Sequence, residues 1–163
     1  DKILKLMNRP YSIKNYKLKI TSIRKMIPDI AITTDVITGF PGETEKDFKE
    51  TIKFIKEIKF SRLHVFPFSA HAKLPAARLP NQIEEKEKIK RARILRRLGI
   101  KLADDYKKKF KNKILDVVIE RIKADKIIGK TEYYFDVEFK RNQIINDKFS
   151  KKQAAIGKIV KIK

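Results

Sequence analysis

The stretch of residues 30–48 constrains the fold of this chain more than any other. It begins with an apolar, β-branched run, Ile30 to Ile37, which is typical of a strand that is buried on both faces. The turn Gly39-Phe40-Pro41-Gly42 ends this run. A helix should follow, because Thr44 and Asp47 have the three-residue spacing of a capping box. Strand, glycine turn and capped helix predict half of a parallel βαβ unit.

This turn would lie at the carboxyl end of a strand, where parallel α/β folds bind ligands. A phosphate cradle there would need free backbone amides and a lysine without carboxylates nearby. Instead, Glu43, Glu45 and Asp47 crowd the helix start, and no Gly-Lys-Ser/Thr string follows, so a P-loop is excluded. Acidic residues at a helix start also complement the helix dipole. That explanation suits Glu45 and Asp47 but leaves Glu43 and the two glycines unexplained, which favours a ligand-binding turn.

Helical and strand patterns flank this unit. Residues 2–8 are expected to end one helix, and Ser12 should cap a second that runs to about Met26. A second strand is expected from Phe60 to Phe66, parallel to the first and reached by a right-handed crossover. Because both faces and edges of such a sheet need cover, we expect that preceding strands of the same sheet or barrel are missing from this chain.

A long, highly charged helix is expected from Ile83 to about Phe110, after a proline-containing loop at 67–82. Its apolar positions have helical spacing and include Ile89, Ala92, Leu95, Leu98, Leu102 and Tyr106. The other positions include Lys90, Arg91, Arg93, Arg96, Arg97 and Lys101. A solvated helix face and a contact with RNA explain these cations equally well.

Beyond Asn112 the pattern changes to short strands, at 114–122, 133–139 and 158–162, with a turn expected around Gly129. About four or five short strands in this space predict a small antiparallel β-barrel of the kind that binds oligonucleotides. The aromatic residues at 133–135 lie among cations, an arrangement that can stack bases and neutralise phosphates. The strand alternation also allows at least one of these rings to be part of the core.

The net charge of +21 favours a polyanionic partner, of which nucleic acid is the commonest in the cytoplasm. A lysine- and isoleucine-rich composition is the alternative source of this charge. The residues expected to contact RNA are Lys130, Tyr133, Tyr134, Lys140 and Arg141 in the strand-rich part and Arg93, Arg96 and Arg97 in the long helix.

Several chemistries are excluded within this chain. It has no cysteine, so it can form neither disulfides nor thiolate metal sites. Its two histidines, His64 and His71, are too few for a metal site of their own. No apolar run approaches the roughly 20 residues of a membrane span, and no signal peptide is visible. The first residue is Asp, so we expect an excerpt of a longer protein or a mature fragment, and a cytoplasmic location.

Five strings, in this order, resemble the radical S-adenosylmethionine methylthiotransferases. They are residues 7–11, 32–45, 60–69, 75–82 and 129–137. Gly-Phe-Pro-Gly-Glu-Thr at 39–44 is typical of the whole family. His-Val-Phe-Pro-Phe-Ser at 64–69 and Ala-Ala-Arg-Leu-Pro-Asn-Gln at 76–82 are most similar to the branch that modifies threonylcarbamoyladenosine in tRNA. The last string is similar to the signature of the family's TRAM domain, a small RNA-binding β-barrel.

The resemblance implies an α/β plus all-β fold. Residues 1–110 would form the C-terminal part of an incomplete, TIM-like radical barrel with a long final helix, and residues 111–163 a TRAM/OB-like β-barrel. The implied reaction adds a methylthio group to the adenine of threonylcarbamoyladenosine at position 37 of tRNA. The implied partners are the tRNA anticodon loop and the missing N-terminal portion of the same protein, with no membrane.

The resemblance also implies cofactors. They are S-adenosylmethionine and [4Fe–4S] clusters, whose cysteine ligands are absent from this chain, so the chain alone could not start the chemistry. Neither a catalytic residue nor a metal ligand is assigned within it. The residues implied to line the cofactor are Gly39, Phe40, Pro41, Gly42 and Glu43 in the turn, Asp35 before it, and His64 and Phe66 on the next strand.

One loop departs from the family pattern. Residues 70–75 read Ala-His-Ala-Lys-Leu-Pro, where the family usually has a basic residue, Gly and Thr before Pro-Ala-Ala. This loop borders the substrate side, so its sequence bears on activity. Two alternatives remain open: a stand-alone basic RNA-binding protein without catalysis, and a methylthiotransferase that acts on isopentenylated adenosine or on an aspartate of a ribosomal protein.

Overall fold

A computed structural model of the chain describes residues 1–71, 74–145 and 155–163. Its contacts divide the chain into two compact units, Asp1–Tyr106 (unit 1) and Lys107–Lys163 (unit 2). The departing loop at 70–75 lies partly outside the described residues, since residues 72 and 73 are not among them.

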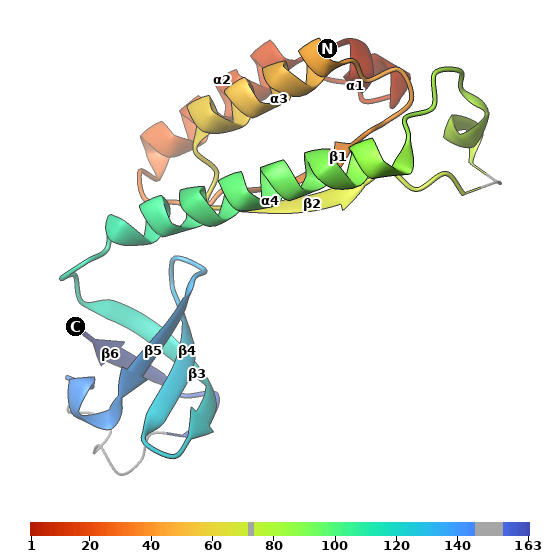
Figure 1. The fold of residues 1–163 in the computed structure, drawn as a ribbon. Helices are drawn as coiled ribbons and strands as arrows, with labels where there is room; N and C mark the ends of the chain where they lie inside the picture. Colours follow the sequence, from red (N-terminus) through yellow and green to blue (C-terminus); the bar gives the residue numbers. More distant parts are fainter. Residues whose placement is uncertain (72–73, 146–154) are drawn as a thin grey trace. The chain divides into compact units, whose positions relative to one another are not determined.

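Unit 1 is a sequence of helices and two strands (Figure 1). The elements are α1 (Lys2–Leu6), α2 (Ile13–Met26), β1 (Thr33–Thr38), α3 (Glu45–Ile58), β2 (Arg62–Pro67), η1 (Pro75–Arg78) and α4 (Glu85–Lys108), which extends two residues into unit 2. The predicted caps are confirmed. The Ser12 hydroxyl accepts a hydrogen bond from the Asn15 amide at 3.2 Å, and Thr44 and Asp47 form a reciprocal capping box at the start of α3.

Strands β1 and β2 pair in parallel, as predicted, and α3 connects them. Their register places Val36 opposite Val65, on the face that packs against the helices. The core on this face is formed by Ile20 of α2, Phe48, Ile55 and Ile58 of α3, Phe60 and Val65, and Ala92, Leu95 and Leu102 of α4. The prediction that the first strand is buried on both faces is wrong, because Thr33, Asp35 and Ile37 on its other face are exposed.

Helix α4 has nearly the predicted bounds, but its buried stripe starts one residue earlier than predicted. Ile89 is 44% exposed, whereas Lys88 and Arg91 are buried. The stripe then continues through Ala92, Leu95, Gly99, Leu102 and Tyr106. The two cations are buried because the first turns of α4 pack against the turn that follows β1, as their contacts with Thr38 and Glu43 show.

Unit 2 contains a curled antiparallel sheet. Its strands are β3 (Leu115–Lys123), β4 (Lys126–Thr131), β5 (Asp136–Lys140) and β6 (Ile159–Ile162), in the spatial order β5-β4-β3-β6, with η2 (Arg141–Gln143) after β5. The chain after β5 returns to β6, where Ile144 bridges to Ile162 and the Ile145 amide donates to the Lys161 carbonyl at 2.9 Å. Parallel β–α elements followed by a small antiparallel β domain confirm the predicted fold class.

The turn predicted around Gly129 is wrong, because Gly129 lies inside β4 and the hairpin turn is at residues 124–125. A Cβ atom at this glycine would lie 2.4 Å from Cγ1 of Val117 and 2.5 Å from the carbonyl oxygen of Val118. The glycine therefore permits close packing against β3 rather than a reversal of the chain. The strand predicted from residue 133 also starts later, at Asp136.

The Asp47 carboxylate makes the stability of unit 1 dependent on pH. It accepts hydrogen bonds from Lys2 Nζ at 2.8 Å and from the Thr44 amide and hydroxyl at 2.9 and 2.6 Å. Burial raises the pKa of Asp47, but these bonds from Lys2 and Thr44 outweigh it and lower the pKa to about 2. The lowered pKa adds stability above the ordinary value of 3.8, and this contribution is lost as the pH falls toward 2.

We therefore expect Asp47→Ala to lower the free energy of unfolding at pH 7 by about 1 kcal/mol, the usual size of a lost cap. The difference from wild type should shrink as the pH falls from about 4 toward 2, in urea titrations followed by circular dichroism. Glu50→Gln, on the next turn of α3 and exposed, is the control and should change stability little. A difference of constant size down to pH 2 would contradict the assignment.

Candidate functional site

Three backbone hydrogen bonds hold the turn after β1 in place. Within the turn, the Glu43 amide donates to the Phe40 carbonyl at 2.9 Å. The Gly42 amide donates to the carbonyl of Asn81, ahead of α4, at 3.0 Å, and the Phe68 amide, just after β2, donates to the Thr38 carbonyl at 2.8 Å. The turn is thus fixed to the segments that follow β2 and precede α4.

Gly39 is needed at this turn for two reasons. Its φ of 71° lies in the left-handed region, and a Cβ atom there would lie 2.4 Å from Cγ and 3.1 Å from Cβ of Lys88. The Thr38 hydroxyl also donates to the Lys88 carbonyl at 3.3 Å. Helix α4 therefore lies directly against the start of the turn.

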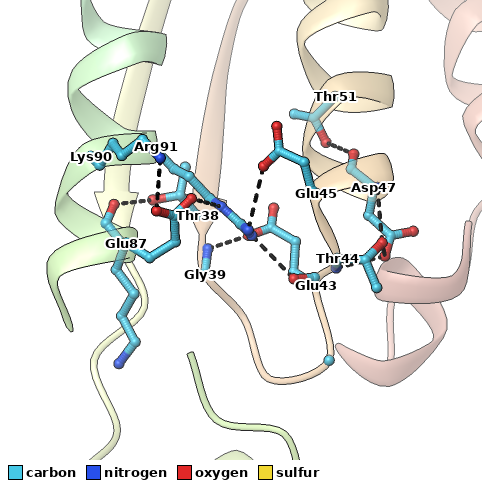
Figure 2. A network of polar contacts seen from close by, with 12 residues as sticks. Thr38, Gly39, Glu43, Thr44, Glu45, Asp47, Thr51, Glu87, Lys90 and Arg91 are labelled. Carbon is cyan, nitrogen blue, oxygen red and sulfur yellow. Dashed lines mark hydrogen bonds and ion pairs between the residues drawn. The ribbon is translucent and has the colours of Figure 1, made fainter. Parts of the chain in front are cut away.

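A buried ion pair joins the end of the turn to α4 (Figure 2). Arg91 Nη1 donates to Glu43 Oε2 at 2.8 Å and to the Glu43 carbonyl oxygen at 3.1 Å. The side chains of Arg91 and Glu43 are only 7% and 5% exposed. Arg91 Nε donates to Glu87 at 3.0 Å, and the Gly39 amide donates to the same Glu43 Oε2 at 2.5 Å. A single carboxylate oxygen thus connects both ends of the turn with the helix.

The electrostatics of this pair follow from its burial. Burial raises the pKa of the Glu43 carboxyl, and the hydrogen bonds from Arg91 and Gly39 offset that rise only in part. Burial lowers the pKa of the Arg91 guanidinium, but its bonds to Glu43 and Glu87 outweigh this and raise the pKa. Each group therefore needs the other to remain charged in this buried position, since an unpaired charge there would be strongly unfavourable.

Three of the predicted cofactor residues lie on one face of the strand pair. The parallel register places Asp35 opposite His64 and Ile37 opposite Phe66, with all four on the face away from the helices. Ile37 and Phe66 are 37% and 51% exposed, Asp35 is exposed and His64 is half-buried. We call these four residues the open row. An apolar pair beside a polar pair suits a ligand with a flat apolar face and polar edges, such as adenosine.

The turn residues are placed differently from the open row. Phe40 and Pro41 are buried, and the Phe40 ring meets the Phe68 ring edge-on at 5.1 Å. The turn can therefore offer a ligand mainly its backbone at Gly42, because Gly39 is buried against Lys88 and Glu43 is occupied by Arg91. An adenosine group fits these residues. An iron–sulfur cluster does not, since the chain has no cysteine and the described residues contain no group of three or more side chains that could hold a metal.

The predicted RNA residues of unit 2 separate into core and surface. The Tyr133 ring stacks on Phe110 at 4.1 Å between ring centroids, and Phe135 lies 5.4 Å from the same ring. Tyr134 is 75% exposed, at a φ of 61° in the loop between β4 and β5. Of the three neighbouring aromatic rings, Tyr134 is the one that is displayed to solvent.

The predicted cations differ in how strongly they are engaged. Lys130 pairs with Asp136, and Lys140 pairs with Asp125 at 3.4 Å. Arg141 is half-buried. In α4, Arg93, Arg96 and Arg97 are exposed, and Arg96 also donates to the Val65 carbonyl at 3.0 Å. Their contacts with RNA stay predictions.

Known proteins share the sequence of this chain. The Radical SAM superfamily model matches residues 1–55. The chain is 39% identical, over 99% of its length, to the threonylcarbamoyladenosine tRNA methylthiotransferase MtaB of Bacillus subtilis (strain 168). It is 34% identical over its whole length to a tRNA-2-methylthio-N(6)-dimethylallyladenosine synthase of Alkaliphilus oremlandii, and 41% identical over 81% to the ribosomal protein uS12 methylthiotransferase RimO of Clostridioides difficile.

The match of residues 1–55 places this part of unit 1 in the radical S-adenosylmethionine superfamily. More narrowly, the chain belongs to the radical S-adenosylmethionine methylthiotransferase family and is homologous to transferases. It covers 35%, 33% and 30% of the three relatives, so it spans about a third of their length. No helix in the described ranges is long and apolar enough to cross a membrane.

The buried pair generates a prediction about stability. Arg91→Met should lower the free energy of unfolding by about 3–5 kcal/mol, because it leaves the Glu43 carboxylate buried without its partner. Adding Glu43→Gln should recover part of this loss, since no buried charge then remains. A double-mutant cycle in urea measures the coupling, and strictly additive losses would contradict the pairing.

Proposed function

We propose that this chain is the C-terminal portion of an enzyme that adds a methylthio group to the adenine of threonylcarbamoyladenosine at position 37 of tRNA. Unit 1 forms the last part of the radical barrel, and unit 2 is a TRAM-like RNA-binding domain. The observation that supports this most directly is the open row of Asp35, Ile37, His64 and Phe66, which lies beside the Gly-Phe-Pro-Gly-Glu turn in a chain of this family.

In this proposal the open row binds the adenosine part of S-adenosylmethionine. Ile37 and Phe66 contact the flat face of the base, and Asp35 and His64 orient its polar edge. The backbone at Gly42 allows the ligand to approach closely, and Gly39 lets the turn pack against α4. When bound to its [4Fe–4S] cluster, S-adenosylmethionine supplies the one-electron chemistry of the transfer, and the cysteines that hold the cluster belong to the rest of the protein.

The proposed tRNA contact combines charge with one exposed ring. The net charge of +21 attracts the anticodon stem and loop, with Lys130, Lys140, Arg141, Arg93, Arg96 and Arg97 as phosphate contacts. Tyr134 is free to stack on an unpaired base, because its ring is largely exposed. Tyr133 contributes through its packing on Phe110, which supports the loop that presents Tyr134.

The choice of nucleoside rests on two observations. The strings at 64–69 and 76–82 resemble the threonylcarbamoyladenosine branch, and the Bacillus subtilis relative named for that substrate is 39% identical over 99% of the chain. Relatives named for dimethylallyladenosine and for ribosomal protein uS12 are 34% and 41% identical.

Nucleoside analysis of tRNA from a deletion strain tests this choice of nucleoside. We expect loss of methylthio-threonylcarbamoyladenosine, retention of its unmethylthiolated precursor, and restoration of the product by the intact gene. Unchanged methylthio-threonylcarbamoyladenosine would overturn the substrate assignment. Loss of the isopentenylated product, or of a mass increment on ribosomal protein uS12, would assign the protein to one of the other two substrates.

The basic charge and the absence of cysteine also support a second candidate of a different class, a stand-alone RNA-binding protein without catalysis. The sequence that precedes this chain discriminates between the two. A Cys-x-x-x-Cys-x-x-Cys string there supports the enzyme, and an open reading frame that starts at this chain supports the RNA-binding protein.

The two tyrosines of unit 2 generate a paired prediction. Tyr134→Ala should weaken tRNA binding by about 1–3 kcal/mol, the usual value of one stacked base, and leave the unfolding free energy within about 0.5 kcal/mol of wild type. Tyr133→Ala should instead destabilise unit 2 by about 1–3 kcal/mol, because it removes the ring that packs on Phe110.

Fluorescence anisotropy with a tRNA anticodon stem-loop, together with thermal unfolding, measures both effects. Affinity should fall steeply between 50 and 200 mM salt, as expected of binding dominated by phosphate contacts. Equal tRNA affinity of wild type and Tyr134→Ala would remove this ring from the interface. A flat salt response would count against the basic surface as the tRNA site.

A further inference from the structure

We propose that Arg91 is a positioning residue for S-adenosylmethionine. It acts through Glu43, because their ion pair holds the turn from Gly39 to Glu43 in the conformation that borders the open row. This inference rests on the proposed function and adds a residue from α4, outside the strands and their turns. It also gives Glu43 a positioning role in place of direct contact with the cofactor.

The guanidinium of Arg91 is fixed by groups from three elements. Its Nε donates to Glu87, one turn earlier on α4, at 3.0 Å, and its Nη1 reaches the carboxylate and the carbonyl of Glu43 at 2.8 and 3.1 Å. Its central carbon lies 5.3 Å from the centre of the Phe48 ring on α3. Because the planar guanidinium presents its donors in a fixed geometry, it positions Glu43 more precisely than the ammonium group of a lysine could.

The Glu43 carboxylate transmits this position across the turn. Its Oε2 accepts both Arg91 Nη1 and the Gly39 amide, so the first and last residues of the turn share one anchor (Figure 2). The side chain is 5% exposed and is occupied by these two donors. A side chain in this state can shape a ligand site, but it has little capacity left to contact the ligand itself.

The turn is adjacent to the open row along the chain and in space. Ile37 belongs to the open row, Thr38 donates to the Lys88 carbonyl of α4, and Gly39 lies against the Lys88 side chain. A displacement of the turn would therefore displace the end of β1, where Ile37 meets Phe66. The position of α4 and the shape of the proposed adenosine wall are linked through this contact.

The test measures cofactor affinity in the full-length protein with its clusters, using S-adenosylhomocysteine as a non-reacting probe in equilibrium dialysis. Arg91→Lys and Glu43→Gln should each raise the Kd on the order of 10-fold, the lower end of the loss caused by removing residues that orient metal ligands. Lys90→Gln is the matched control, because it removes a neighbouring charge of α4 that pairs with Glu87 at 3.1 Å. It should bind the probe with the wild-type Kd.

A second control separates positioning from loss of stability. Leu102→Ala removes a core side chain far along α4 from the turn, and it should leave the Kd unchanged in the folded protein. Wild-type Kd values for folded Arg91→Lys and Glu43→Gln, or an equal rise for Leu102→Ala, would overturn the proposal. If Arg91→Lys does not fold, Glu87→Ala decides, because it removes the acceptor of the Arg91 Nε hydrogen bond: a raised Kd supports the proposal, and a wild-type Kd overturns it.

Failure of the proposed function gives a different result from failure of this inference. A full-length wild-type protein that does not bind the probe refutes the assignment of S-adenosylmethionine itself. A wild-type protein that binds the probe, with variants that bind it equally well, refutes only the role of Arg91. Saturating cofactor should restore the turnover of Arg91→Lys, since a positioning defect raises the KM for the cofactor more than it lowers kcat.

Discussion

The ion pair between Glu43 and Arg91 is the interaction on which the geometry of unit 1 depends. It joins residues that are 48 positions apart, from the end of the glycine turn to the first half of α4. Burial of two charges is costly, and a well-packed apolar pair often gives equal stability. Stability alone therefore does not explain this pair. Its directional bonds to the Glu43 carbonyl and, through the carboxylate, to the Gly39 amide fix one conformation of the turn, which an apolar contact would not do.

The helices α2, α3 and α4 contribute to a single core on one face of β1 and β2, and this one-sided cover defines the candidate site. A parallel strand pair usually has both faces covered. Here the open row remains on the other face, and it combines Ile37 and Phe66 with Asp35 and His64. Such a face suits the inner wall of a barrel, where the contents of the barrel complete the cover. The fixed turn and the open row are thus two parts of one proposed wall.

The sequence predicted what local chemistry determines. The caps at Ser12 and Thr44 need only neighbours along the chain, and the parallel pairing follows from a strand–helix–strand order. The two-residue period of a β-strand puts Asp35 and Ile37 on the same face. Whether that face is exposed depends on the elements that pack on it, which the local sequence does not specify. The apolar pattern of α4 starts at Ile89, and in that phase Arg91 falls outside the buried stripe, so the pattern does not identify it as the partner of Glu43. Seven residues are about two helical turns, so Leu102, Leu95 and Lys88 lie on the same side of α4, and this is its buried side. Arg91, three residues after Lys88, lies on that side too. Gly129 is required because the backbone of β3 comes close to it. This contact involves residues that are distant along the chain, so the sequence around Gly129 does not indicate it.

The basic residues also depend on contacts that the sequence does not show, because the number of lysines does not tell how many of them are paired with carboxylates. Lys126, Lys130, Lys140 and Lys161 of unit 2 each pair with a carboxylate, so the sheet displays much less positive charge than its lysine content implies. The packing of Phe110 likewise leaves Tyr134 as the exposed ring of the three neighbouring aromatics. RNA binding by unit 2 would then combine long-range attraction and phosphate contacts from its basic residues with a single stacking contact. Such a combination holds RNA without reading its sequence, because base identity is set by contacts to base edges. Under the proposed function, selection of the modified adenosine would then fall to the part of the protein that includes the open row.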